Sequence, residues 1–196
     1  MSQKTPSLLT STITLVVICF VSAFILGYVH NKTLEPIKQA KDNQELDAIA
    51  QVVNEFDNNP FTEKMIIMTK NKKHKLAMYP ARKNGRLNSV AIKTYSNTGF
   101  GGKIELITGF NVDGSIKSFK VISSNETPGL GSKVDEPKFK TQLEGFNPRR
   151  QILKVRQDGG DVDAVTAATI SSRAVLRAID RAFDAFSNFK SGNSYE

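Results

Sequence analysis

Two threonines stand three residues apart near the C-terminal end of the chain, in the stretch DVDAVTAATISSRAV at residues 161–175. Small helix-forming residues surround them, so we expect a helix to begin near residues 169–172 with the hydroxyls at its N-terminus. Unpaired backbone N–H groups and the positive end of the helix dipole suit such a position to a phosphate group. The alternative is a plain N-cap, in which a Thr or Ser side chain only satisfies backbone N–H groups.

A second candidate site is the stretch NETPGLGSK at residues 125–133. Pro128 fixes its own φ, and Gly129 and Gly131 permit positive φ, so the backbone can turn sharply and approach a flat ligand closely. A third stretch, NTGFGG at residues 97–102, places a glycine cluster before an apolar strand-like run. It does not match GxGxxG, and the sequence contains no Walker motif, so neither common nucleotide-binding loop is indicated.

Composition excludes several classes of site. The only cysteine, Cys19, lies in an apolar run, and the two histidines, His30 and His74, are far apart. We therefore expect no disulfide framework and no metal centre within this chain, and any redox function needs an organic cofactor. The formal net charge is +8, but basic residues alternate with acidic ones. This pattern favours a solvated surface over a nucleic-acid-binding face.

Residues 8–29 form an uncharged apolar run. As a helix the run is about 33 Å long, enough to cross a bilayer. Only Lys4 precedes the run and no A-x-A site follows it, which favours an uncleaved membrane anchor over a signal peptide. Lys32, Lys38 and Lys41 follow it, so the positive-inside rule slightly favours a cytoplasmic domain.

Beyond the anchor, residues 33–53 predict a second helix, with Pro36 in its first turn. Its expected apolar stripe is Leu46, Ile49, Ala50 and Val53.

Short strand-like runs follow, at residues 65–69, 75–79, 89–95, 103–110 and 115–123. Asn84-Gly85 and Asp113-Gly114 are hairpin turn signals between them. The apolar alternation slips near Ile107 and Phe119, so we expect one buried sheet face with a local irregularity.

The last helix is expected from Ser171 to about Phe189. Its apolar face is Val175, Ala178, Ile179, Ala182, Phe183 and Phe186. Antiparallel strands with packed helices predict the α+β class. We divide the chain into a tail (1–7), a transmembrane helix (8–29), a helical stalk or linker (30–60) and one α+β domain (61–196).

Taken in order, TGFGGKIELITGFNVDGSIKSFKVISSNETPGLGSK and DAVTAATISSRAV resemble the FMN-binding domain family of the Rnf and Nqr respiratory complexes. The resemblance covers nearly the whole chain and is tightest over residues 97–133 and 161–176. Chain length and the single anchor make the sequence more similar to G subunits of the Rnf type than to C subunits of the Nqr type, which are usually longer.

The resemblance implies a covalent cofactor. In this family a flavin transferase joins FMN through its phosphate to the last threonine of a D-x-x-(S/T)-(G/A)-A-T pattern. The pattern is matched by Asp163, Thr166, Ala167, Ala168 and Thr169, which makes Thr169 the implied site of the phosphodiester. Thr166 and Ala167 replace the commoner Ser and Gly. The resemblance also implies a loop near the flavin, formed by Glu126, Thr127, Pro128, Gly129, Leu130 and Gly131, with Lys133 just beyond it.

The resemblance further implies a function. The chain would be an electron-transfer subunit relaying electrons through FMN between ferredoxin and NAD, coupled to Na⁺ or H⁺ transport, without a catalytic pocket of its own. Its expected partners are the other membrane subunits, the flavin transferase and the membrane, but not nucleic acid. The expected location is the bacterial inner membrane, crossed once, with the domain on the periplasmic side. The alternatives are a C-type subunit of a Na⁺-pumping NADH:quinone oxidoreductase and a membrane-tethered adaptor without cofactor.

Overall fold

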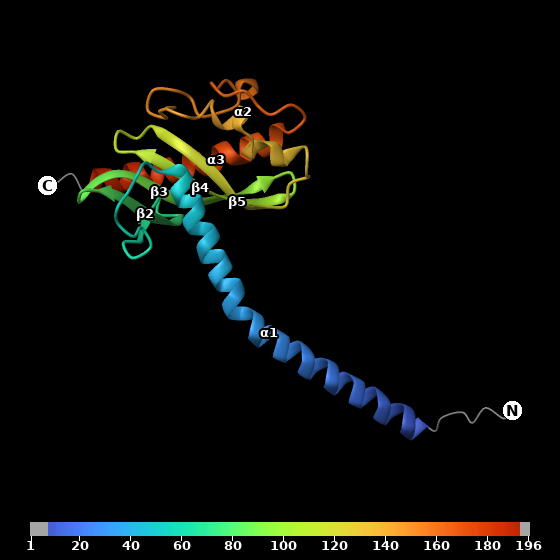
Figure 1. Cartoon of the computed structure of the whole chain (residues 1–196). Helices are drawn as coiled ribbons and strands as arrows, with labels where there is room; N and C mark the ends of the chain where they lie inside the picture. Colours follow the sequence, from blue (N-terminus) through green and yellow to red (C-terminus); the bar gives the residue numbers. More distant parts are fainter. Residues whose placement is uncertain (1–7, 193–196) are drawn as a thin grey trace. The chain divides into compact units, whose positions relative to one another are not determined.

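A five-stranded antiparallel sheet, whose strands lie side by side in chain order, organises the C-terminal part of the molecule (Figure 1). The computed structural model describes residues 8–192. The elements are α1 (Leu8–Val52), β1 (Met65–Met68), β2 (Lys75–Lys83), β3 (Arg86–Gly99), β4 (Gly102–Asn111), β5 (Ile116–Ser124), η1 (Gly131–Asp135), α2 (Pro137–Lys140), η2 (Arg156–Asp158) and α3 (Thr169–Gly192). The expected α+β class is confirmed.

Helix α1 is continuous from Leu8 to Val52, whereas two helices were expected. Pro36 lies inside it and not in a first turn, so that expectation was wrong. Good helix formers flank the proline on both sides, so the helix continues although the proline removes one backbone hydrogen bond. The N-terminal part of α1 has a mean hydropathy of 2.4 over its most apolar window, and by length and composition it can span a membrane. The boundary between the two compact units of the chain lies at Asn43/Gln44.

The last turns of α1, which belong to the second unit, cover one face of the sheet. The buried residues on this face are Ala48, Ile49, Val52, Val53, Tyr79, Ala81, Ala91 and Ile107. The contact is closest at Gly109 in β4, where a Cβ atom would lie 1.7 Å from the carbonyl oxygen of Val52. Leu46 and Ala50, which the expected stripe placed inside, are exposed, because the buried face runs instead through Ala48 and Val52.

Helix α3 covers the opposite face of the sheet and forms the larger core. Five of the six residues of its predicted apolar face are buried and Phe183 is half-buried, so the prediction for this helix is confirmed. Phe186 stacks on Phe110 of β4 with ring centroids 5.6 Å apart. Thr94 of β3 ties the helix to the sheet by donating a 2.9 Å hydrogen bond to the carbonyl oxygen of Ala178. The sheet is therefore buried on both faces, not on one as expected.

Both predicted hairpins are present. Asn84 and Gly85 have φ values of 52° and 74° at the β2–β3 turn, as a type I′ turn requires. Between β4 and β5 the register shifts twice, after Glu105 and after Gly109. The bulge after Gly109 explains the slip at Phe119, which pairs with Thr108 and lies in the same core as Phe110 although its position is odd-numbered. Ile107 departs from the alternation for another reason, because it is buried on the opposite face of the sheet.

Two buried hydroxyls among residues 8–192, those of Thr108 and Ser187, have no hydrogen-bond partner, and Thr108 supplies a stability test. Thr108 Oγ1 has no hydrogen-bond partner within residues 8–192, whereas Thr94 Oγ1 donates to helix α3. We expect Thr108→Val to raise the free energy of unfolding by about 1 kcal/mol, because valine has the same shape and removes an unpaired polar group. Thr94→Val is the matched control and should lower it by about 1 kcal/mol. Urea denaturation measures both, and a destabilised Thr108→Val would contradict the assignment of that hydroxyl.

Candidate functional site

The three motif stretches converge at the N-terminus of α3 around a cleft of about 350 Å³. The cleft is lined by Phe100, Glu126, Thr127, Leu130, Gly131, Ala167, Ala168, Thr169, Ile170 and Ser171. Phe100 belongs to the tight β3–β4 turn, the next four residues belong to the loop after β5 and the start of η1, and the last five form the turn before α3 and its first residues. Stretches separated by more than 20 residues in the sequence thus form one site.

Glu126 connects these three stretches. Its side chain is buried, with the residue only 8 % exposed. The carboxylate accepts a 2.6 Å hydrogen bond from Ser171 Oγ at Oε2 and a 3.2 Å hydrogen bond from the backbone N–H of Gly101 at Oε1. Within residues 8–192 it forms no ion pair. A buried carboxylate held by neutral donors fixes the geometry of everything bonded to it.

Two glycines are required by close approach to this carboxylate and its loop. A Cβ atom on Gly131 would lie 2.1 Å from Glu126 Oε2, and one on Gly101 would lie 1.9 Å from the carbonyl oxygen of Asn125. From the sequence, Gly131 was assigned to a sharp backbone turn, and Gly101 only to a glycine cluster before a strand. Here the reason is steric: the two loops lie so close to each other and to α3 that no side chain fits between them.

Helix α3 begins at Thr169, within the expected range. The residue before it is Ala168, whose side chain has no oxygen, so the plain threonine or serine N-cap is not formed there. The first intrahelical hydrogen bond runs from Ser172 N to Ala168 O, at 3.0 Å. The N–H groups of Thr169, Ile170 and Ser171 precede it and point out of the helix end. Within residues 8–192 these three N–H groups have no hydrogen-bond partner, so the half-buried Thr169 side chain lies beside three free donors at the positive end of a helix dipole.

Ala167 adopts a left-handed conformation, with φ at 61°. It occupies the position where the commoner motif has glycine. A 2.9 Å hydrogen bond from Ala168 N to Val165 O closes the turn that contains it. Ser172 Oγ supports this turn from inside, accepting from Val165 N and donating to Ala168 O, both at 3.0 Å. The left-handed turn reverses the chain so that residues 166 and 169 face different clefts.

Three large apolar side chains are exposed at the first cleft. Phe100 is 73 % exposed, Leu130 46 % and Ile170 47 %. Leu130 was predicted from the sequence as a site residue, whereas Phe100, Ile170 and the buried Ser171 were not. Phe100 carried a signal: a lone aromatic residue between glycines in a tight turn has nothing local to pack against. An apolar cleft with a few polar groups at one end is the usual form of a small-molecule site.

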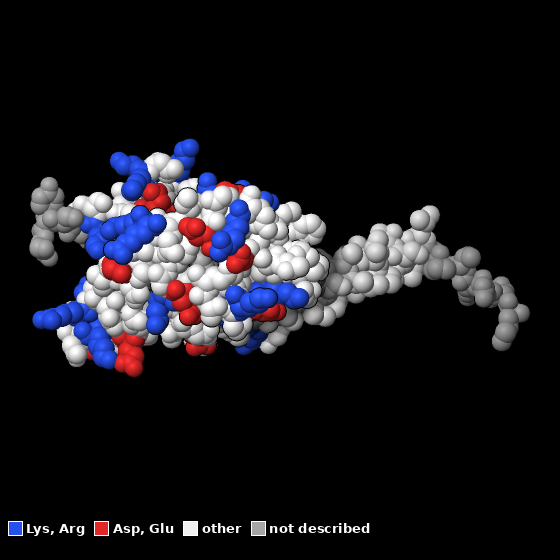
Figure 2. Space-filling view, turned by 90° about the horizontal axis from the view of Figure 1, so that it is seen from above, with Lys and Arg blue, Asp and Glu red and all other residues white. Residues whose placement is uncertain are grey.

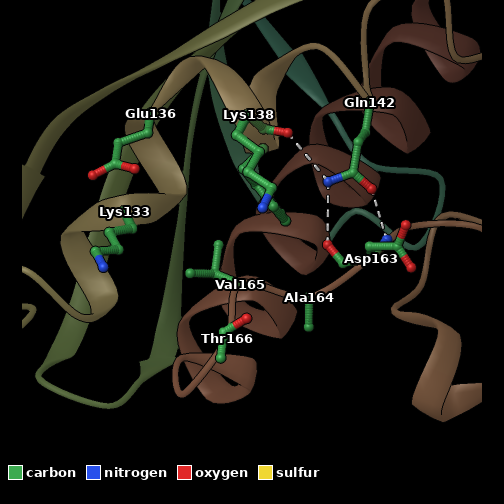
Figure 3. Close-up of a pocket in the computed structure, with 9 residues that line it drawn as sticks. Lys133, Glu136, Lys138, Gln142, Asp163, Ala164, Val165 and Thr166 are labelled. Carbon is green, nitrogen blue, oxygen red and sulfur yellow. Dashed lines mark hydrogen bonds between the residues drawn. The ribbon is translucent and has the colours of Figure 1, made fainter.

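The other predicted site residues lie elsewhere. Lys133, Asp163 and Thr166 line a second cleft of about 560 Å³, together with Glu136, Lys138, Phe139, Gln142, Ala164 and Val165. Figure 3 shows the Gln142 amide bracketing the backbone of Asp163, which it does by accepting from Asp163 N at 2.8 Å and donating to Asp163 O at 3.3 Å. The Asp163 carboxylate pairs with Arg156 at 2.7 Å. Gly129 lines neither cleft, has φ at 76° and donates through its N–H to Ser132 Oγ.

Asp135 fastens the segment that follows the Glu126 loop. Its carboxylate accepts from Lys120 of β5 at 2.9 Å, forms an ion pair with Lys140 of α2 at 2.8 Å and accepts from the backbone N–H of Val121 at 3.1 Å. Burial raises the pKa of Asp135, but the hydrogen bonds from Lys140, Lys120 and Val121 outweigh burial, and the net pKa is lowered. The clamp holds η1 and α2 to the edge strand β5.

The surface charges are mixed in sign. Figure 2 shows Lys and Arg side chains interspersed with Asp and Glu over the face viewed from above. Among residues 8–192 no group of three or more His, Cys, Asp and Glu side chains is placed to hold a metal ion.

The turn at Ala167 supplies a second stability test. We expect Ala167→Gly to raise the free energy of unfolding by about 0.5–1 kcal/mol, because relief of about 1–2 kcal/mol of left-handed strain exceeds the added entropy of the unfolded chain. The thermal midpoint should rise by roughly 2–3 °C. Ala174→Gly, in the buried interior of α3, is the control and should lower stability by about 1 kcal/mol. A lower midpoint for Ala167→Gly would show that the turn is not strained.

The Asp135 clamp predicts a pH dependence. A carboxyl whose folded pKa is lowered contributes stability that is present above its unfolded pKa of about 3.9 and is lost as pH falls through the folded value. Asp135→Asn should therefore be less stable than wild type at pH 7, on the order of 1 kcal/mol. The difference should shrink as pH falls below about 4. Denaturation at pH 7, 4 and 3 measures it, and a difference that is constant with pH would exclude the clamp.

The comparisons with known proteins agree with this geometry. A family model described as the FMN-binding domain matches residues 99–184, which contain both clefts. In solved structures the fold is shared with NqrC of Shewanella oneidensis, with a TM-score of 0.50 at 23 % identity over 71 % of this chain and 68 % of that one. It is shared also with the C-type subunit of the Na⁺-translocating NADH-quinone reductase of Parabacteroides distasonis, with a TM-score of 0.52 at 15 % identity over 83 % and 98 %.

Relatives of known name match along most of the chain. The G-type subunit of the ion-translocating oxidoreductase complex of Vibrio cholerae (strain O395) is 31 % identical in an alignment of 180 positions that covers 87 % of this chain and 86 % of the relative. Its counterpart in Vibrio parahaemolyticus is 32 % identical in an alignment of 177 positions that covers 85 % of this chain and 83 % of the relative. Because these relatives are more than 30 % identical to this chain over most of its length, the chain belongs to the family of G-type subunits of the ion-translocating oxidoreductase complexes.

Proposed function

We propose that this chain carries FMN joined through its phosphate to Thr169, and that it relays electrons through this flavin within an ion-translocating oxidoreductase complex. One observation carries the proposal: a threonine hydroxyl stands at the open N-terminus of α3, at the edge of the apolar cleft lined by Phe100, Leu130 and Ile170.

The residues present fit the chemistry of the group. A phosphodiester on Thr169 keeps one negative charge, and the N–H groups of the first turn of α3 and its dipole favour that charge. Phe100, Leu130 and Ile170 provide apolar surface suited to the faces of a flat aromatic ring. The cleft volume of about 350 Å³ lies within the range of small-molecule sites. Bound FMN supplies one- and two-electron transfer.

The residues around the proposed attachment site have different roles. Thr169 Oγ1 would form the bond to the phosphorus of a flavin dinucleotide, with the nucleoside monophosphate as the leaving group and the hydroxyl proton passing to a base on the flavin transferase. Backbone N–H groups at the start of α3 would hold the remaining charge of the diester. Phe100 and Leu130 would limit water over the apolar part of the cleft.

The surroundings of the protein follow from family membership and from α1. Membership implies other complex subunits as partners, and the apolar part of α1 is a candidate anchor. We infer further that a flavin transferase matures the chain, that residues 8–29 cross the inner membrane once, and that the domain from residue 61 onward faces the periplasm. The electrons would pass between ferredoxin and NAD, coupled to Na⁺ or H⁺ transport. Protease added to spheroplasts should degrade the domain. Full protection of the domain would instead place it on the cytoplasmic side.

Covalent attachment is tested by the fluorescence of denatured protein. The full-length chain and Thr169→Ala are each co-expressed with a flavin transferase and run on a denaturing gel under ultraviolet light. We expect a fluorescent band near 22 kDa for the native chain and a dark band for Thr169→Ala, with both proteins folded by circular dichroism.

Thr166→Ala is the matched control, because Thr166 is the other hydroxyl of the motif and lines the second cleft. It should stay fluorescent. A dark Thr166→Ala with a fluorescent Thr169→Ala would move the attachment to Thr166. Two dark bands for the native chain and Thr169→Ala would favour the adaptor without cofactor.

A further inference from the structure

We propose that Glu126 is a positioning residue for flavin attachment, whose carboxylate holds the first turn of α3 in the orientation that presents Thr169. The proposal rests on the proposed function for its chemistry and on the contacts of Glu126 for its physical basis. The sequence resemblance placed Glu126 near the flavin without a role.

The contacts of Glu126 point inward, toward protein groups. Oε2 accepts from Ser171 Oγ at 2.6 Å, and Oε1 accepts from Gly101 N at 3.2 Å. Ser171 is two residues after Thr169 on the same helical turn, so the position of its hydroxyl fixes the rotation of that turn about the helix axis. Both carboxylate oxygens are thereby engaged in joining elements.

Glycine backbones pack tightly around the Glu126 carboxylate. The backbone of Gly131 lies against the carboxylate, because a Cβ atom there would be 2.1 Å from Glu126 Oε2 and 2.7 Å from Ser171 Oγ. A Cβ atom on Gly99 would be 2.4 Å from Glu126 Oε1. Glycines on both sides admit the carboxylate between the β3–β4 turn and the start of α3. Loss of the carboxylate would leave a void at this junction and would release Ser171.

The alternative is that Glu126 acts through its negative charge near the phosphate. The two roles separate in the variants. Glutamine has the same shape: its oxygen can accept from Gly101 N, and its amide can donate to Ser171 Oγ, so Glu126→Gln keeps the junction and removes the charge. Glu126→Ala removes both, and Ser171→Ala removes only the bond to α3.

The experiment measures the rate of covalent attachment on the full-length chain in detergent. Purified flavin transferase and flavin dinucleotide are added to the flavin-free chain, and samples quenched in denaturant are read by gel fluorescence. We expect Glu126→Ala to slow attachment on the order of a hundredfold, as a misplacement of about 1 Å can do. Ser171→Ala should also slow it, and Glu126→Gln should restore it to within a few-fold of wild type.

A second readout does not need the cofactor. In the flavin-free chain, amide hydrogen exchange over residues 169–176 should be faster in Glu126→Ala than in wild type and near wild type in Glu126→Gln. The control is a variant of Ile92 in the sheet core, Ile92→Val or Ile92→Ala, whichever has a thermal midpoint nearer that of Glu126→Ala. It should leave the rate of attachment unchanged.

Two results would overturn the positioning role: attachment by Glu126→Ala at the wild-type rate, or equal slowing in the matched Ile92 variant. Slowing in Glu126→Gln as large as in Glu126→Ala would assign the effect to charge, and would also overturn it. If wild type itself acquires no flavin, the proposed function fails, and hydrogen exchange alone decides whether Glu126 holds the helix start.

Discussion

The site depends on one buried carboxylate with neutral partners. Glu126 lies between the β3–β4 turn and the first turn of α3 and binds both through Gly101 and Ser171. A carboxylate out of contact with water and without a cation is tolerated only when hydrogen bonds replace its hydration. The glycines beside it follow from this arrangement, because any side chain at Gly131 would displace the carboxylate. Gly99 and Gly131 are therefore explained by the buried carboxylate of Glu126, whereas Gly102 and Gly129 are explained by their positive φ.

The rest of the fold supplies a rigid base for that junction. The sheet is packed on both faces, by α3 on one side and by the last turns of α1 on the other, and Gly109 lets the carbonyl of Val52 approach strand β4 directly. The Asp135 clamp joins η1 and α2 to β5 and so limits movement of the loop that carries Glu126. Sites built on packed elements hold their geometry better than sites on free loops. The large apolar side chains of the cleft rim, Phe100, Leu130 and Ile170, are left open to solvent.

Local signals predicted the parts of the fold that local forces determine. The stripe of α3, the Asn84-Gly85 turn and the strand pairs follow from periodicity and turn chemistry, and the structure contains them. The continuous α1 did not follow, because Pro36 is a strong local break signal that flanking helix formers outweigh. The second buried sheet face was missed because the residues that cover it come from the end of a helix far away in sequence. Ser171 was missed because its role exists only when Glu126 lies opposite it. Thr166 and Thr169 line different clefts because Ala167 between them has a left-handed φ. Alanine rarely adopts this conformation, so the sequence did not predict it.

The openness of the first cleft explains why a covalent bond suits this site. A drug-sized ligand bound without a covalent link is usually buried over roughly 70–90 % of its surface, and its affinity comes from that burial. Phe100 and Ile170, at 73 % and 47 % exposed, form a shallow rim that covers a ring far less. Apolar burial at about 25 cal/mol per Å² would then supply too little free energy to offset the entropy of binding. The proposed bond at Thr169 would remove that requirement, since a tethered ring cannot diffuse away. The same shallow rim would leave the ring accessible to neighbouring subunits, as the proposed electron relay requires. A deeper cleft would hold a cofactor more tightly but would expose less of the ring to an electron-transfer partner, so the shallow cleft and a covalent bond at Thr169 are consistent with each other.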